Sequence, residues 1–197
     1  MTEKTHTLID SVQLRMLGPS DAEAMKAAYQ LNREHLAPWD PVRADAFYTL
    51  AGQRANIESK IALRAAGSEI PWILLQGERI IGAITLTGIV RGPFLSGNLG
   101  YWVDRDFNGR GIGTAAVAFA IETAGNGLGL HRLQAGTLRH NAASQRILKR
   151  NGFEQIGVAP AYLKIAGTWQ DHVLYQRILE AQGAFVREGP SAAEPVD

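Results

Sequence analysis

The stretch from Gly97 to Ala116 constrains the fold of this chain more than any other part of the sequence. Its first half alternates in character and is rich in aromatic and β-branched side chains, which predicts a strand. The chain then passes through Gly109, Gly111 and Gly113. Apolar residues follow Gly113 at spacings of four, seven, eight and eleven, which predicts one face of a helix. The sequence therefore predicts a strand, a glycine-rich turn and a helix in direct succession.

This order of elements is typical of sites that bind phosphate. Glycine has no Cβ, so backbone N–H groups can approach an anion closely. The first turn of a helix adds unpaired N–H groups and the positive end of the helix dipole. The three glycines do not form the GxGxxG fingerprint, and Thr114-Ala115 stands where a P-loop has Lys followed by Ser or Thr. From the residues alone, a phosphate site and a tight turn that merely joins strand to helix are both open.

Composition limits the classes of protein to consider. A chain of 197 residues is long enough for one domain with a full core. A net charge of +1 gives no broad case for nucleic acid or an anionic membrane as partner. The chain has no cysteine, which excludes disulfides, thiolate metal sites and a cysteine nucleophile. No signal peptide or apolar span is visible, so a cytoplasmic protein is expected.

The hydrophobic periodicity predicts an α/β (α+β) single domain with a mixed, mostly antiparallel sheet of about seven strands and about four helices. Besides the strand that opens the glycine turn, strands are predicted at Val12–Leu17, Trp72–Gln76, Arg79–Val90, His131–Thr137, Phe153–Val158, Ala161–Ile165 and His172–Ile178. Helices are predicted from Ser20 or Asp21 to Leu31, at Asp45–Ala65, from Gly113 onward and at Asn141–Arg150. The domain is expected to span residues 1–180, and residues 181–197 are expected to form a frayed polar tail.

Histidines and tryptophans carry weaker signals. His131 and His140 lack carboxylate partners at ligand spacing, so no metal is expected. Of the four tryptophans, Trp72, Trp102 and Trp169 are expected to pack in the core, and Trp39 lies between two prolines in a loop.

The turn from Asn108 to Gly113 resembles the acetyl-CoA pyrophosphate loop of the GCN5-related N-acetyltransferases (GNAT), usually written Q/R-x-x-G-x-G/A. Asn108 stands where that motif usually has Gln or Arg. The resemblance covers roughly residues 12–178. Within the family, four stretches are similar to the RimJ/RimL-type ribosomal-protein-alanine N-acetyltransferases: residues 32–39, 99–103, 141–144 and 150–154.

The resemblance implies where acetyl-CoA would bind. In that fold the strand before the glycine turn separates from its neighbour, and the pantetheine arm inserts between them. The residues that would line the arm are Tyr101, Trp102 and Val103, with a backbone N–H near Val103 stabilising the oxyanion. The residues that would line the pyrophosphate are Asn108, Gly109, Arg110, Gly111, Ile112, Gly113 and Thr114.

Two residues on the predicted helix at 141–150 add an argument from spacing. Asn141 and Ser144 are three positions apart, so they share a helix face, and an amide and a hydroxyl there can serve one ligand. The resemblance implies that Ser144 is the general acid that protonates the CoA thiolate, with Tyr162 as the other candidate. The alternatives are that Asn141 only caps the helix and that Ser144 has no chemical role.

The general base is less defined. Family members often have an acidic residue before the tyrosine of a late strand, but here Ala161 precedes Tyr162. Glu34, and with it His35 and Asp40, lies in the loop between the first two helices, which borders the acceptor site in this fold. A base acting through an ordered water is one interpretation, and a solvated loop charge is the other.

These observations lead to the hypothesis of an acetyl-CoA-dependent N-acetyltransferase. The resemblance implies a ribosomal protein as the amine acceptor. Its N-terminal α-amine is the expected group, because an α-amine has a pKa of about 7.7–8.0 and needs little base strength. A lysine side chain, at about 10.4, would need a stronger base. The alternatives are a small amine such as an antibiotic or a polyamine, another acyl donor, or a non-catalytic acyl-CoA-binding module. The resemblance also allows a homodimer.

Overall fold

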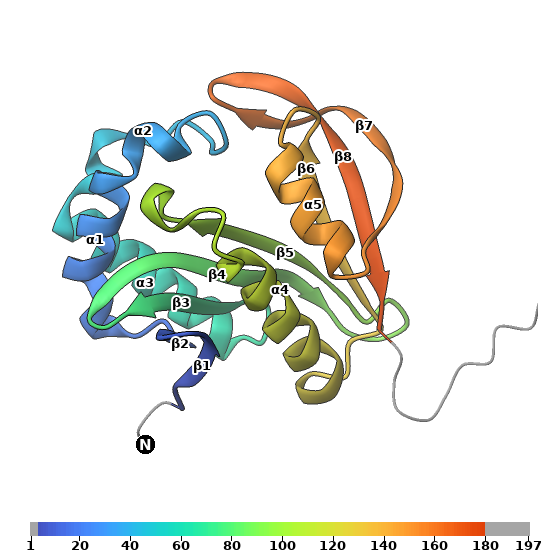
Figure 1. The fold of residues 1–197 in the computed structure, drawn as a ribbon, viewed down its shortest axis with the longest axis horizontal. Helices are drawn as coiled ribbons and strands as arrows, with labels where there is room; N and C mark the ends of the chain where they lie inside the picture. The colour runs from blue at the N-terminus through green and yellow to red at the C-terminus, as the bar shows by residue number, and fades with distance from the viewer. Residues whose placement is uncertain (1–3, 180–197) are drawn as a thin grey trace, which may run out of the picture.

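The computed structural model describes residues 4–179 and contains one eight-stranded sheet in the order β1-β2-β3-β4-β5-β6-β8-β7 (Figure 1). The strands are His6–Ile9 (β1), Val12–Met16 (β2), Ile70–Gln76 (β3), Arg79–Val90 (β4), Ser96–Val103 (β5), Arg132–Leu138 (β6), Glu154–Ile165 (β7) and Thr168–Ile178 (β8). The α-helices are Ala22–Leu31 (α1), Arg33–Leu36 (α2), Leu50–Ala65 (α3), Ile112–Glu122 (α4) and Ala142–Arg150 (α5). The predicted fold class is confirmed. Residues 4–179 form eight strands and five α-helices, against predicted totals of about seven and about four. The predicted tail at 181–197 lies outside the described residues.

The helices cover both faces of the sheet and bury a core on each. Leu17, Met25 and Ile57 form a core with Ile73 and Leu75 under α1 and α3. The alternate residues of β3, Trp72 and Leu74, belong to a larger core that includes α4. A strand that is buried on both faces needs a continuous apolar run, which is why residues 72–75 show no polar alternation.

Three local predictions were wrong, and the contacts of each segment show why. The strand β1 was not predicted, because its half-buried side chains give little periodic signal, and it is held by β2 and by the His6 ring 4.9 Å from Phe119 of α4. The helix predicted from Asp45 begins instead at Leu50, since Thr49 is extended and its side chain accepts a hydrogen bond from the Gly52 N–H. Residues 45–48 form a separate 3₁₀ turn. The two strands predicted at 153–165 are one strand, β7, with an irregularity opposite β8 between Ala159 and Leu163.

The sheet divides between β5 and β6. This parallel pair is joined only from Ser96 opposite Arg132 to Asn98 opposite Gln134. Beyond that point β5 continues along β4 as far as Val103, while β6 continues along β8 as far as Leu138. The two strands diverge in Figure 1, with α4 and α5 beside the opening. The separation implied by the family resemblance is therefore present.

Candidate active site

The glycine turn lies at the end of β5 and leads directly into α4. Gly109 and Gly111 have φ angles of 77° and 80°, a left-handed conformation that favours glycine. Gly111 is the N-cap of α4, and no side chain within residues 4–179 caps the helix there. The first backbone N–H groups of α4 are therefore not satisfied by a capping side chain, which is the state that suits an anion.

Glycine is required at position 113 for a different reason, which is helix packing. A Cβ at this position would lie 2.9 Å from Cδ1 of Ile147, so the missing side chain lets α4 pack closely on α5. Close packing of these helices places the start of α5 near the end of β5. The placement of Gly113 along the pyrophosphate stays a prediction.

The side chains of the turn have partners within the protein. Asn108 Nδ2 lies 3.2 Å from His35 Nε2 on α2. Arg110 donates a hydrogen bond to the Asp106 carbonyl at 2.7 Å and lies over the Phe107 ring, 4.9 Å from its centroid. The main chain of the turn is thus its most available ligand-binding group, and Asn108 needs no longer side chain to hold the turn against α2.

A buried polar network holds the turn in place. Asp104, fully buried, accepts hydrogen bonds from Asn32 Nδ2 at 3.0 Å, Arg79 Nη2 at 2.7 Å and the Asp106 N–H at 2.9 Å. Asn32 also accepts from the Arg105 N–H at 3.0 Å. Burial acts to raise the pKa of Asp104, but these bonds and the Arg79 charge outweigh it and hold the pKa below its usual value. The network ties the end of α1 to the turn, and sequence analysis missed it because its members are far apart in the chain.

The structure brings Tyr101 of β5 and Ser144 of α5 together across the opening. Their hydroxyl oxygens are 2.9 Å apart. Ser144 also donates its backbone N–H to Asn141 Oδ1 at 3.0 Å, which confirms Asn141 as the N-cap of α5. The cap uses the amide oxygen and leaves the amide nitrogen for a ligand. Burial raises the pKa of Tyr101 to about 12, so its hydroxyl keeps its proton at neutral pH.

The other two predicted catalytic residues are exposed. Tyr162 of β7 is 45% exposed and packs its ring 5.5 Å from that of His172. Glu34 is exposed on α2. Neither lines the two cavities described below.

The burial of the tryptophan side chains differs in part from the prediction. Trp72 is buried, as expected, but Trp169 is 65% exposed on the β7–β8 hairpin, so its predicted place in the core was wrong. Trp39 is 37% exposed, and its ring lies 5.4 Å from that of His140.

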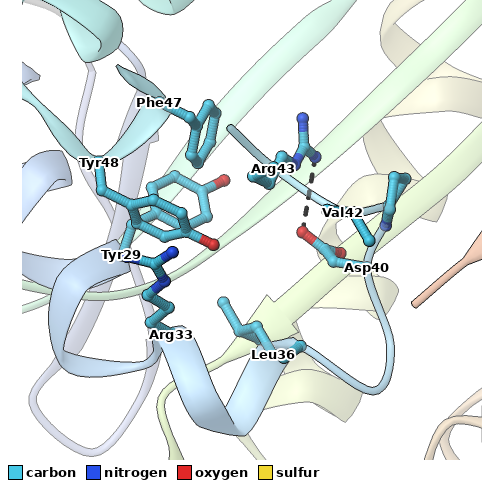
Figure 2. A pocket seen from close by; sticks show the side chains of 10 residues that line it. Tyr29, Arg33, Leu36, Asp40, Val42, Arg43, Phe47 and Tyr48 are labelled. Atoms are coloured by element: carbon cyan, nitrogen blue, oxygen red, sulfur yellow. Dashed lines mark hydrogen bonds and ion pairs between the residues drawn. The ribbon is translucent and has the colours of Figure 1, made fainter. Parts of the chain in front are cut away.

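Two cavities, of about 150 and 260 Å³, adjoin each other. The smaller is lined by α1, α2 and the segment that follows α2 as far as Tyr48, and the larger lies between α1, α3 and the sheet. Four residues line both of them: Tyr29, Asp40, Arg43 and Phe47. Figure 2 shows the smaller cavity, where the side chains of Asp40 and Arg43 point toward each other and the rings of Phe47 and Tyr48 lie beside Tyr29. The larger cavity extends to Gly100, Tyr101 and Trp102 of β5. Sequence analysis singled out Asp40 but missed the aromatic residues, whose helical spacing is that of an ordinary core.

Two kinds of feature are absent from residues 4–179. No helix there combines the length and apolarity that crossing a bilayer requires. The same residues contain no group of three or more His, Asp or Glu side chains placed to hold a metal ion.

Known proteins that resemble this chain in sequence and in structure are acetyltransferases. Residues 11–154 match the family described as Acetyltransferase (GNAT) domain. The probable N-acetyltransferase YjcK of Bacillus subtilis (strain 168) is 34% identical over 164 residues, which cover 82% of this chain and 91% of that protein. The crystal structure of ribosomal-protein-S5-alanine acetyltransferase from Vibrio fischeri has a TM-score of 0.86 at 31% identity, covering 90% of this chain and 97% of that one. Mycobacterium smegmatis RimJ in complex with CoA-disulfide has a TM-score of 0.81 at 27% identity, covering 85% of this chain and 81% of that one.

The chain therefore belongs to the GNAT acetyltransferase family, and it is an N-acetyltransferase. Its relatives within that family are the RimJ/RimL-type ribosomal-protein N-acetyltransferases. Both statements confirm what the sequence motifs implied.

Proposed function

We propose that this enzyme transfers the acetyl group of acetyl-CoA directly to the N-terminal α-amine of a ribosomal protein. The observation that carries the proposal is the opening between β5 and β6, which runs from the glycine turn past the Tyr101–Ser144 pair. A thioester that followed this opening would lie beside the larger cavity, which Tyr101 also lines.

The residues of the turn suit a diphosphate. The left-handed glycines and the uncapped start of α4 offer backbone N–H groups, and the side chains of Asn108 and Arg110 are engaged elsewhere. Trp102 and Val103 would follow the pantetheine arm, and the Asn141 amide nitrogen would donate to it. The related M. smegmatis RimJ forms a complex with CoA-disulfide, which supports a coenzyme A thioester as the ligand.

Ser144 has the role of general acid in this proposal. When bound, acetyl-CoA supplies an activated carbonyl and a thiolate leaving group. Ser144 donates its hydroxyl proton toward the sulfur, and the Tyr101 hydroxyl, 2.9 Å away, holds the serine in position. Tyr162 is the competing donor, and a backbone N–H near Val103 stabilises the negative charge on the carbonyl oxygen.

The acceptor class comes from the relatives. The V. fischeri protein is named for acetylation of the alanine of ribosomal protein S5. An acceptor of this kind would place the enzyme in the cytoplasm, and a homodimer stays a prediction.

An acceptor panel tests the proposal. The purified protein, incubated with acetyl-CoA, should acetylate peptides that carry a ribosomal-protein N-terminus at the α-amine, as read by mass spectrometry. The same peptides with a blocked N-terminus and an internal lysine should stay unmodified, because lysine needs a stronger base. If polyamines or aminoglycosides were acetylated and no peptide was, the proposed class of acceptor would be wrong.

Gly111→Val should weaken CoA binding at least about tenfold, which corresponds to about 1.4 kcal/mol. A β-branched side chain at φ 80° is strained and stands where the backbone would meet the diphosphate. The matched control is Gly67→Val, which has the same left-handed strain at φ 72° and no neighbouring atoms within 4 Å of its Cβ position. Isothermal titration with CoA should show loss of affinity in Gly111→Val alone. Equal affinity in both variants would show that the diphosphate does not bind at this turn.

A further inference from the structure

The larger cavity joins the strand proposed to carry the acyl donor to a carboxylate. Gly100, Tyr101 and Trp102 of β5 form part of its wall, and Asp40 forms another part. Among the residues that line the two cavities, Asp40 is the one carboxylate. We infer that Asp40 binds the acceptor amine and accepts its proton, an inference that rests on the proposed acetyl transfer.

The main chain fixes the position of Asp40. Its N–H donates to the Leu36 carbonyl at 3.0 Å, at the end of α2. Its carbonyl accepts from the Ala166 N–H at 3.0 Å, in the turn between β7 and β8. The residue is thus held between two parts of the molecule that are distant in sequence, with its side chain pointing toward Arg43 in the wall of the smaller cavity (Figure 2).

The carboxylate of Asp40 is held loosely compared with the other charges around the cavities. Arg43 Nη2 lies 3.5 Å from Asp40 Oδ2, at the outer limit of a hydrogen bond, and its guanidinium also lies over the Phe47 ring. By contrast, Arg33 pairs with Asp45 at 2.6 Å and Lys60 with Glu69 at 2.5 Å. Asp40 can therefore exchange its long contact with Arg43 for an ammonium group at little cost, whereas the other pairs are already closed.

The titration behaviour of the cavity agrees with this role. Burial raises the pKa of Asp40, and the charge of Arg43 and its hydrogen bond oppose the rise. Burial also raises the pKa of Tyr29 to about 12, as it does for Tyr101, so neither hydroxyl can serve as a base near neutral pH. The charged and titratable groups that line the cavities with Asp40 are Tyr29, Arg33, Arg43, Tyr48, Lys60 and Tyr101.

The chemistry balances with these two side chains. The bound ammonium first loses one proton to solvent, which frees the nitrogen lone pair. The neutral nitrogen then forms a bond to the acetyl carbonyl carbon, and the bond between that carbon and the CoA sulfur breaks. Asp40 takes the second proton from the nitrogen, and Ser144 gives one proton to the sulfur. Both side chains then exchange with solvent. A carboxylate is a sufficient base because the nitrogen becomes much more acidic once its lone pair is committed to the carbonyl carbon.

Asp40→Asn tests the inference. We expect kcat to fall about 100-fold, within the range for loss of a general base, while CoA affinity stays unchanged. The ionised carboxylate is the active form, so wild-type kcat should decline as pH falls through the raised pKa of Asp40, above the ordinary aspartate range. This decline should be absent in Asp40→Asn and present again in Asp40→Glu. A role in folding alone would lower the melting temperature without removing the pH dependence.

Two further variants make the result specific. Glu58→Gln, on an exposed position of α3 outside both cavities, should keep wild-type kcat. Glu34→Gln tests the competing base: a 100-fold loss there, with wild-type rates in Asp40→Asn, would overturn the inference. If Asp40→Asn is not recovered folded, Asp40→Ala and Asp40→Glu give the same comparison.

The measurements use whichever amine the wild-type enzyme acetylates. Absence of acetylation on every amine, with CoA bound, would count against the proposed function. An active wild type with an equally active Asp40→Asn would overturn only the role of Asp40.

Discussion

Asp104→Asn should lower the free energy of unfolding by about 2–4 kcal/mol, the cost of weakening a buried, hydrogen-bonded charge. Asp104 is fully buried and accepts from Asn32, Arg79 and the Asp106 N–H. An asparagine has one carbonyl oxygen in place of two carboxylate oxygens, so at least one of these donors loses its acceptor. The substitution should also disturb the active site, because the same network holds the turn before α4.

Urea unfolding at two pH values checks this result. The folded-state pKa of Asp104 lies below its unfolded value, so its contribution is present above about pH 4 and is lost as pH falls through the folded pKa. The difference between wild type and variant should therefore shrink in acid. The matched control is Asp106→Asn, whose side chain is 56% exposed, and it should cost less than about 1 kcal/mol. A similar loss in both variants, or a difference that does not change with pH, would contradict the assigned role of Asp104.

Ser144→Ala should lower kcat about 100-fold with acetyl-CoA affinity within about twofold of wild type, since a general acid acts in the transition state. The α5 cap uses the Ser144 backbone N–H and the Asn141 side chain, and both survive the substitution. Loss of helix stability therefore should not confuse the result. The readouts are steady-state rates by thiol release and CoA affinity by titration.

Two companion variants assign the proton donor. Ser59→Ala, on an exposed position of α3, is the control and should keep wild-type turnover. Tyr162→Phe separates the two candidate acids: a large loss of kcat there, with none in Ser144→Ala, would give the role to Tyr162. Equal, small losses in both would remove a side-chain acid from the mechanism.

Much of the fold was predictable because local chemistry specifies it. The turn at Gly77 between β3 and β4 has φ 59°, as a tight glycine turn requires. The cap at Asn141 and the left-handed Gly152 after α5 also follow from single residues. Two elements that failed have contacts with distant parts of the chain. The strand β1 packs against α4, and the 3₁₀ turn at 45–48 places the Phe47 ring 4.8 Å from the Tyr29 ring of α1.

Some parts of the candidate site could likewise be predicted from the sequence, and others could not. The glycine turn and the Asn141–Ser144 pair lie within single stretches of chain, so residue type and spacing were enough to identify them. The cavity is built from α1, the loop after α2, α3 and β5, and the apolar spacing of Tyr29 and Phe47 gave no sign of it.

Local residue type accounts for the backbone of the glycine turn, because only glycines adopt φ near +80° at little cost, and the motifs around that turn were enough to indicate the enzyme class. Long-range packing, by contrast, sets which carboxylate lines the larger cavity. Glu34 and Asp40 are six positions apart and carry the same acid group, yet one is exposed on α2 and the other is held at the cavity by a bond from the β7–β8 turn. The charge of a side chain is a property of its residue, but its neighbours are set by long-range packing.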